Sequence, residues 1–337
     1  MSPWIIIAAT LYFAYNIVVV SAMLQEAVQT SWRKSGCTVA RVISAFFVAL
    51  PLHTTIIFVA WILPLWFPHR FKVSGERIRR KECFDVIPVT AEHGGIFSYY
   101  QPRLSGKMPA VIILPIFGRD NYQLERYFAR YFAGRGLAAI VVHRGKEEVI
   151  GDERMFNIFL FRSVMEGISV VNWAQAHPAI SADRIAIFGI SMGAIRGALL
   201  AAVDQRIAVT VLGLAGGDLP YIIRHCQDGA WRGRGISARR ATYLKEKRIT
   251  PEVFERRLRK HIVWDPLRFA QFADPDKILL ILAAFDRVIH FKKGLLLRRA
   301  MKKPKTVILP SGHYTAMLYL PLVRWIAWRF IKKKLRQ

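Results

Sequence analysis

The sequence predicts an α/β protein, with a mostly parallel sheet covered by helices on both faces, that follows an N-terminal membrane anchor. Three observations lead to this fold class. After residue 70, short apolar runs alternate with stretches of helical period; before it stand two long runs almost without charge; and a serine between two glycines joins an apolar run to a small-residue helix. Strands buried on both faces read as continuous apolar runs, and their alternation with helices is typical of parallel sheets.

Charge and hydropathy together are unusual. Fifty Lys and Arg against 23 Asp and Glu give the 337 residues a formal charge of +27, yet 53% of residues are hydrophobic and the mean hydropathy is +0.24. A disordered polycation lacks such apolar content, and a cytosolic domain is seldom both this apolar and this basic. The three cysteines, Cys37, Cys83 and Cys226, are too few for a disulfide scaffold and lack zinc-ligand spacing, so we expect thiols in a reducing compartment.

Residues 1–69 are predicted to anchor the chain in a membrane. Residues 3–24 contain no charged side chain, and residues 42–67 contain none apart from His53 in its protonated form. Both runs reach the roughly 20 residues that a helix needs to cross the hydrocarbon core. Pro51 and Pro64 interrupt the second run, which leaves a reentrant or interfacial segment open there.

Orientation follows from the flanking charges. Three Lys/Arg lie between the two apolar runs and six lie in residues 70–81, which favours a multi-pass membrane protein with its N-terminus and its C-terminal body in the cytoplasm. A cleaved signal peptide is disfavoured, because the first run is long and no Lys or Arg precedes it.

Residues 70–337 are predicted to fold as the α/β domain. An antiparallel hairpin is expected first, with strands at 84–89 and 96–100 around a turn at His93 to Gly95. Further strands are expected at 110–114, 138–142, 185–188, 209–214, 278–283 and 306–309, helices at 124–134, 159–177 and 192–203, and an amphipathic helix at 318–335.

The most informative motif is Gly189-Ile190-Ser191-Met192-Gly193, which joins the strand at 185–188 to the helix at 192–203. A serine in a tight strand-to-helix turn projects its hydroxyl from the carboxyl edge of the sheet, and glycines two residues away on either side prevent collisions with the backbone. The N-terminus of the following helix offers N–H groups to a developing oxyanion. This pattern predicts Ser191 as a nucleophile.

Given this motif in this context, the chain resembles the α/β-hydrolase family over about residues 84–337. The resemblance implies an acid after a later strand and then a histidine near the end of the chain. Asp286 follows the strand around 278–283 and is the last carboxylate side chain in the sequence, and His313 follows the last strand. Asp274 and Asp276 precede the strand around 278–283, so we interpret them as turn or capping residues. The other late histidine, His290, precedes the last strand, so His313 is the better candidate for the base.

The three residues have distinct chemical roles. Serine is a poor nucleophile at neutral pH, so His313 is expected to accept its proton and return it to the leaving group. Asp286 is expected to hold the imidazole tautomer and stabilise the imidazolium. In the family, the oxyanion is bound by two backbone N–H groups, which implies Met192 and Phe117 here. The loop at 114–120 departs from the family's His-Gly-x-Gly pattern at Pro115 and Ile116.

Residues 220–275 are predicted to form a lid-like insertion. Residues 220–262 contain twelve Lys/Arg against four acids, and fourteen Lys/Arg but no acid follow Asp286. Such charge beside a membrane favours anionic lipids as partners, and the predicted C-terminal helix adds Trp325, Trp328 and Phe330. A solvated basic face is the plainer alternative. No motif for nucleic-acid binding accompanies the charge, so nucleic acid is not an expected partner.

The sequence thus predicts a membrane-anchored serine hydrolase that cleaves an ester, lipid or acyl substrate through an acyl-Ser191 intermediate. An acyltransferase or a thioesterase would use the same residues, and a catalytically silent hydrolase-fold membrane scaffold is the alternative from a different class. No metal or organic cofactor is expected, because no clustered ligand spacing occurs.

Overall fold

The computed structural model describes residues 83–90, 96–117, 122–143, 153–228 and 236–336. The predicted membrane segments, the hairpin turn at His93 and the three residues Gly118 to Asp120 lie outside this part of the chain. Within it, no helix combines the length and the apolar content that a bilayer crossing requires.

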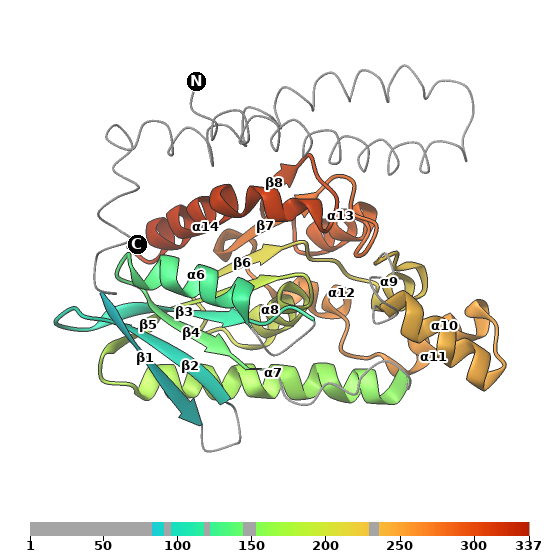
Figure 1. The fold of residues 1–337 in the computed structure, drawn as a ribbon, viewed down its shortest axis with the longest axis horizontal. Helices are drawn as coiled ribbons and strands as arrows, with labels where there is room; N and C mark the ends of the chain where they lie inside the picture. Colours follow the sequence, from blue (N-terminus) through green and yellow to red (C-terminus); the bar gives the residue numbers. More distant parts are fainter. Residues whose placement is uncertain (1–82, 91–95, 118–121, 144–152, 229–235, 337) are drawn as a thin grey trace, which may run out of the picture. The chain divides into compact units, whose positions relative to one another are not determined.

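The described residues form an eight-stranded sheet with the strand order β1-β2-β4-β3-β5-β6-β7-β8 (Figure 1). The strands β1 and β2 are antiparallel to each other and β2 is antiparallel to β4, whereas β4, β3, β5, β6 and β7 pair in parallel. The strands are β1 (Phe84–Thr90), β2 (Ile96–Pro102), β3 (Met108–Leu114), β4 (Ala138–Val142), β5 (Ile180–Ile190), β6 (Val209–Gly213), β7 (Ile278–Ala283) and β8 (Lys305–Leu309).

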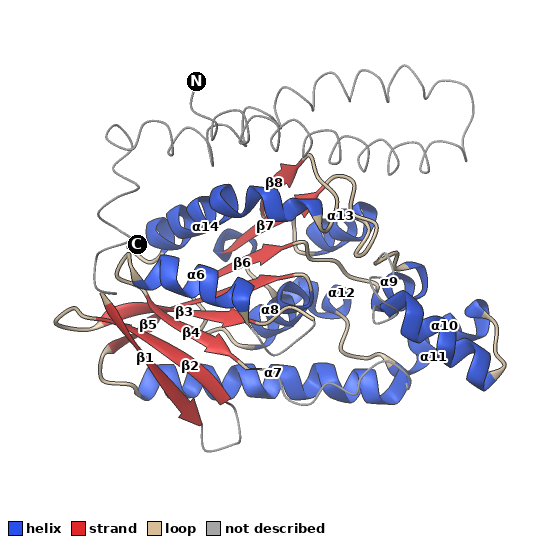
Figure 2. Ribbon diagram, viewed as in Figure 1, coloured by secondary structure: helices blue, strands red, loops and turns tan. Residues whose placement is uncertain are grey.

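Helices connect the parallel strands (Figure 2). They are α6 (Gln123–Ala133), α7 (Glu153–Ala176), α8 (Met192–Val203), α9 (Leu219–His225), α10 (Ile236–Lys247), α11 (Pro251–His261), α12 (Pro266–Phe269), α13 (Phe291–Ala300) and α14 (Leu320–Lys334). Short 3₁₀ turns occupy Ala270–Phe272, Pro275–Lys277 and Thr315–Tyr319.

The alternation of side chains along the strands sends apolar residues to both faces of the sheet. In β3, Ile112 belongs to the core cluster beneath α7 and α8, together with Leu160 of α7 and Leu199 of α8. On the other face, Phe188 of β5 packs against Phe128 of α6, with ring centroids 4.4 Å apart. Both sides of the central strands are therefore buried, which is why these strands read as continuous apolar runs.

Helices α6 and α14 cover that second face together. The guanidinium of Arg324 in α14 lies 4.9 Å from the ring of Tyr127 and 4.6 Å from that of Tyr131, both in α6. These contacts join segments almost two hundred residues apart in the sequence, and Figure 1 shows the two helices side by side.

The predicted insertion contains helices α9 to α12, between β6 and β7, and α10 and α11 lie at its far end (Figure 1). Asp265 connects the start of the insertion to its last part. Its buried carboxylate accepts hydrogen bonds from the N–H groups of Asp218 at 3.0 Å, Leu219 at 2.6 Å and Leu267 at 2.8 Å. Burial raises the pKa of Asp265, although the three backbone donors act in the opposite direction.

Contacts divide the described residues into two units. The smaller one contains Ala283–Asp286 and Leu309–Leu322, and the larger one contains the rest of the described residues. Inside the smaller unit, the N–H of Ala284 donates to the carbonyl of Leu309 and that of Phe285 donates to Ser311, both at 2.9 Å.

The α/β fold class with a mostly parallel sheet is confirmed, and the bounds of β4, β7 and α8 agree with the sequence to the residue. The strand expected at 185–188 is longer in both directions, and the helix expected from 159 begins at Glu153. The helix α13 was not predicted.

Candidate active site

The turn at Ser191 has the geometry expected of a nucleophile elbow. Strand β5 ends at Ile190 and helix α8 begins at Met192, so Ser191 alone makes the connection. Its backbone has φ 55° and ψ −118°, a conformation that costs a non-glycine residue about 1–3 kcal/mol. The N–H of Ser191 donates to Gly213 in β6 at 2.8 Å, which holds the strained residue at the end of the sheet.

The two flanking glycines are required by backbone contacts. A Cβ atom on Gly189 would lie 2.3 Å from the carbonyl oxygen of Gly193, and one on Gly193 would lie 2.3 Å from that of Leu114. Side-chain carbons do not approach backbone oxygens so closely. The first turn of α8 therefore lies directly against the end of β3, where the predicted oxyanion loop begins.

The structure brings Asp286 and His313 together within the smaller unit. The carboxylate Oδ2 of Asp286 accepts a hydrogen bond from Nδ1 of His313 at 2.8 Å, and the two side chains are only 4% and 10% exposed. This bond directs the other ring nitrogen, Nε2, away from the carboxylate. Next to the histidine in the sequence, the N–H of Gly312 donates to the hydroxyl of Thr315 at 2.8 Å. This bond stabilises the loop that carries His313. Ser191 belongs to the larger unit.

Asp274 and the other late histidine, His290, have structural partners. Asp274 caps the turn at Pro275–Lys277 by accepting the N–H of Asp276 at 2.9 Å, as predicted. The Nε2 atom of His290 lies 2.9 Å from the backbone carbonyl of His225, in the larger unit. These contacts leave Asp286 and His313 as the late acid and base that pair with each other.

The predicted oxyanion loop contains a residue that sequence reasoning missed. The N–H of Ile116 donates to the carboxylate of Glu125 at 2.8 Å, and Glu125 is buried in the first turn of α6. Glu125 thus fixes the loop one residue before Phe117, which is half-buried. The other predicted donor, Met192, is the first residue of α8, where a backbone N–H has no acceptor within its own helix. A lone acid on an amphipathic helix gives no sequence signal for this positioning contact.

Metal-ligating residues do not cluster in this part of the molecule: the described residues include no group of three or more His, Cys, Asp or Glu arranged to hold an ion.

No protein-family model and no curated protein matches the chain. Its fold, however, is shared with solved structures. An α/β hydrolase, GrgF, from Penicillium sp. sh18 matches 75% of this chain and 99% of its own, with 16% sequence identity and a TM-score of 0.55. The chain has the α/β-hydrolase fold.

Two esterases share this fold with the chain. An acetyl xylan esterase from Paenibacillus sp. R4 covers 76% of this chain and 90% of its own at 13% identity and a TM-score of 0.55. The Pyrococcus furiosus esterase Pf2001 covers 78% and 96% at 14% identity and a TM-score of 0.53. At such identities the α/β-hydrolase fold is what is established, and activity has to be argued from the residues.

Proposed function

We propose that the protein is a serine hydrolase that cleaves carboxylic esters through Ser191, His313 and Asp286. The observation that carries the proposal is the backbone of Ser191, held at φ 55° between a strand and a helix N-terminus. A strained polar residue at such a turn is maintained by its surroundings at a cost in stability, and strain of this kind clusters at functional sites.

Sheet topology supports the participation of Asp286. The parallel strands β5, β6 and β7 are in register, with Ile190 beside Gly213 and Gly213 beside Ile281. Residues that follow β5 and β7 therefore leave the sheet at its carboxyl edge, where α/β proteins carry their sites. Asp286 comes three residues after β7, and its partner His313 comes four residues after β8.

The proposed reaction has two steps. In the first, Oγ of Ser191 attacks the ester carbonyl carbon while its proton passes to Nε2 of His313; the C–O bond then breaks and His313 gives that proton to the leaving alkoxide. In the second, His313 takes a proton from water as the hydroxyl attacks the acyl carbon, and the proton returns to Ser191 as the acid departs. Asp286 stabilises the imidazolium in both steps.

The backbone N–H groups of Met192 and Phe117 are the proposed oxyanion donors. The close approach of Gly193 to Leu114 supports their proximity, because it joins the first turn of α8 to the start of the loop that contains Phe117. Glu125 is a positioning residue, since it acts on the loop through Ile116. Removal of one such donor typically slows an acyl-transfer enzyme about 10²-fold to 10³-fold.

We further propose a membrane-attached enzyme with a lipid or acyl ester as substrate and a cytoplasmic catalytic domain. The support is the pair of uncharged runs at 3–24 and 42–67 together with the basic insertion. The insertion exposes cations for which the described residues provide no ion pair: Lys245, Lys247, Arg248, Arg256, Arg257 and Lys260. Each cation near anionic headgroups adds about 1 kcal/mol of attraction. Esters are preferred to amides because an alkoxide is the better leaving group.

One labelling experiment tests the proposal. Membranes containing the full-length protein are washed with alkaline carbonate and treated with a fluorophosphonate probe, which reacts only with an activated serine. We expect a labelled band that stays with the membranes, no label on Ser191→Ala, and at least 100-fold slower labelling of His313→Ala. Ser169→Ala, which removes a hydroxyl on α7, is the matched control and should label like the wild type.

The alternative functions give different results. A folded wild-type protein that takes no label would indicate a silent hydrolase-fold scaffold and contradict the proposal. Labelling that depends on Ser191, followed by transfer of the acyl group to an added alcohol or thiol in preference to water, would indicate an acyltransferase. Release of label-reactive protein from the membrane by carbonate would contradict the anchor while leaving the hydrolase intact.

A further inference from the structure

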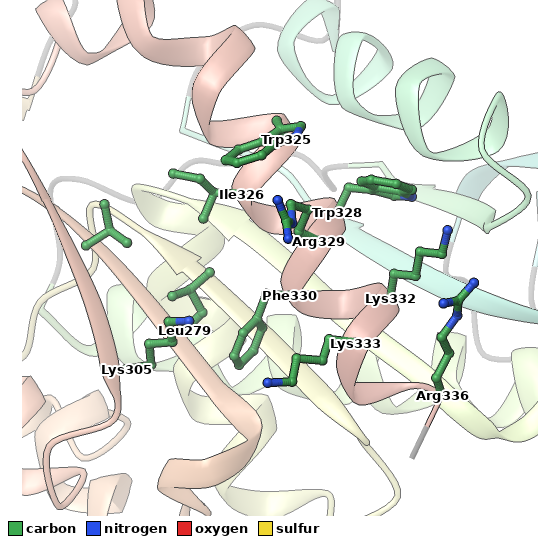
Figure 3. A pocket seen from close by; sticks show the side chains of 11 residues that line it. Leu279, Lys305, Trp325, Ile326, Trp328, Arg329, Phe330, Lys332, Lys333 and Arg336 are labelled. Carbon is green, nitrogen blue, oxygen red and sulfur yellow. The ribbon is translucent and has the colours of Figure 1, made fainter.

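A groove of about 920 Å³ lies between α14 and the strands β7 and β8. Leu279 of β7 and Val307 of β8 line the groove from the sheet. Ile326 and Phe330, one turn apart on α14, line it from the helix (Figure 3). Residues four apart share one face of a helix, so α14 presents an apolar stripe to the sheet along this groove. The inside of the groove is thus aliphatic and aromatic.

Cations surround this apolar groove. Lys305, Arg329, Lys332, Lys333 and Arg336 line it, and no carboxylate is among the lining residues that the structure describes. Within the described part of the chain, none of these five side chains forms an ion pair. A lining that combines apolar walls with cations alone is complementary to an anionic amphiphile.

Tryptophan rings hold two of these cations in place. The guanidinium carbon of Arg329 lies 5.0 Å from the centroid of Trp325, and Nζ of Lys332 lies 4.7 Å from that of Trp328. Cation–π contacts at such distances are favourable and reduce the side-chain freedom that ligand binding would otherwise remove. Trp325 is also 44% exposed, as is common for tryptophans at a membrane interface.

The helix dipole explains only part of this charge. Lys332 and Lys333 occupy the last turn of α14, where cations are stabilised by the exposed carbonyl groups. Lys305 comes from a different element, the first residue of β8, and Arg329 lies further from the end of the helix. The fold thus gathers cations from two elements around one apolar groove.

We propose that this groove binds an anionic phospholipid, with an acyl chain against Leu279, Val307 and Ile326 and the phosphate among Lys305, Arg329 and Lys333. A nucleic acid is less well matched, because Leu279, Val307 and Ile326 give the groove an aliphatic wall, which suits an acyl chain better than the polar edges of a base. The proposal goes beyond ester hydrolysis: the cations gather at the amino end of β8, whereas the proposed catalytic residues follow the carboxyl ends of strands.

Tryptophan quenching by brominated lipid tests this site. The full-length protein is held in micelles of an uncharged detergent, into which dibrominated phosphatidylglycerol or dibrominated phosphatidylcholine is titrated. Bromine quenches a tryptophan only on contact. We expect saturable quenching by the anionic lipid at a mole fraction at least tenfold lower than that needed with phosphatidylcholine. The double variant Trp325→Phe/Trp328→Phe should lose this lipid-specific component.

A pair of charge-matched variants separates the groove from general attraction. Lys305→Gln/Arg329→Gln/Lys333→Gln removes three exposed groove cations, and Lys107→Gln/Arg126→Gln/Arg162→Gln removes three exposed cations that belong neither to the groove nor to the insertion. The groove variant should raise the half-saturating mole fraction about tenfold, and the control variant by less than twofold. Because only binding is measured, the result does not depend on whether Ser191 is active.

Several outcomes would overturn the proposal. Equal weakening in both triple variants would mean that bulk charge alone attracts the lipid. Equal quenching by phosphatidylcholine would mean that the groove does not distinguish an anionic headgroup from one without net charge. Displacement by inorganic phosphate or by oligothymidylate at equal concentration would assign the groove to a free anion or a nucleic acid. Absence of saturable quenching would mean that the groove is closed to lipid, as it would be under another segment or a second copy of this chain.

Discussion

Gly193 determines how closely helix α8 can approach strand β3. An alanine in a helix is normally about 1 kcal/mol more stable than a glycine, so Gly193→Ala would be expected to stabilise an isolated helix. Here the new Cβ would stand 2.3 Å from the carbonyl oxygen of Leu114, a backbone atom inside the sheet. We predict that Gly193→Ala lowers the free energy of unfolding by about 2–3 kcal/mol, as measured by urea unfolding in an uncharged detergent.

Gly197 provides the control in the same helix. A Cβ there would meet the side-chain end of Leu212 at 2.9 Å, which can rotate away, so Gly197→Ala should cost less than Gly193→Ala. A Gly193→Ala protein as stable as the wild type would show that β3 and α8 separate easily, and would remove the packing argument for the predicted oxyanion loop.

For single residues, the sequence predicts features that depend on local geometry and misses those that depend on tertiary contacts. The turn at Ser191 can be recognised in the sequence, because the apolar strand, the two glycines and the serine lie within a few residues of one another. The contact between Glu125 and Ile116 cannot be predicted from the sequence, because a buried acid on α6 has the same sequence pattern as any polar residue on an amphipathic helix. The pairing of Asp286 with His313 was predicted only from the resemblance to the α/β-hydrolase family, because chain order alone does not show which acid lies near which histidine.

An ion-pair network among the helices connects the insertion to the rest of the larger unit. Asp218 bonds Lys293 of α13 at 2.6 Å and Arg259 of α11 at 3.0 Å. Glu255 continues the network from Arg259, at 2.5 Å, to Arg224 of α9, at 2.6 Å. Asp218 and Lys293 are largely buried, so water screens this pair less than the exposed ones.

We predict that Lys293→Met loosens the insertion, because Asp218 then keeps only its half-exposed partner Arg259. Amide hydrogen exchange in α9 and α11 should become about fivefold to tenfold faster, equivalent to about 1 kcal/mol of local stability, while exchange in β6 stays unchanged. The effect should persist in 1 M salt, because salt only weakly screens a largely buried ion pair.

The neighbouring Lys292→Met is the control for this prediction, since Lys292 is exposed and belongs to the same turn of α13. Equal exchange in both variants would mean that the network does not restrain the insertion. Uniformly faster exchange in β6 would instead indicate that Lys293 supports the whole sheet.

Element boundaries were predictable where burial is uniform. Strand β7 is buried at every residue, and its continuous apolar run of six residues has the length of a buried strand and is short for a helix. Helix α13 was missed because Gly294 stands in its middle, and glycine weakens a helical reading. The structure requires that glycine: a Cβ there would lie 2.9 Å from Leu282 and 3.0 Å from the carbonyl oxygen of Ala215. Tertiary packing overrides local preference at this position.

The α/β-hydrolase fold as a whole was predictable from the alternation of strands and helices and from one motif. The insertion was predictable as a basic segment but not as helices. Helix α10 has one buried residue, Tyr243, and α11 has two, Phe254 and Leu258, so neither carries a strong apolar period. Their packing partners lie in α9 and in α7, and α7 is far away in the sequence.

Stability should fall as the solution becomes mildly acidic, and His177 is one cause. Its ring packs between Tyr99 and Trp173, with centroids 4.9 and 4.7 Å away, and its Nδ1 accepts the N–H of Ala179 at 3.3 Å. Burial lowers the pKa of His177 below its ordinary value of 6.5, because the charged imidazolium is poorly solvated there. In the unfolded chain the imidazole binds a proton more readily.

The sign of the pH dependence follows from this difference in proton binding. The unfolded state takes up more protons as the pH falls below about 6.5, so the free energy of unfolding declines from there towards the folded pKa and is fully retained above 6.5. We predict that His177→Gln reduces the decline between pH 7 and pH 5, measured by urea unfolding at each pH. His225, whose pKa is lowered first by burial and then by the charge of Arg224, should contribute in the same direction, so the double variant His177→Gln/His225→Gln should flatten the profile further. A wild-type profile that is level or rises towards pH 5, or a decline of the same size in all three proteins, would contradict this assignment and leave general charge repulsion as the cause of any acid sensitivity.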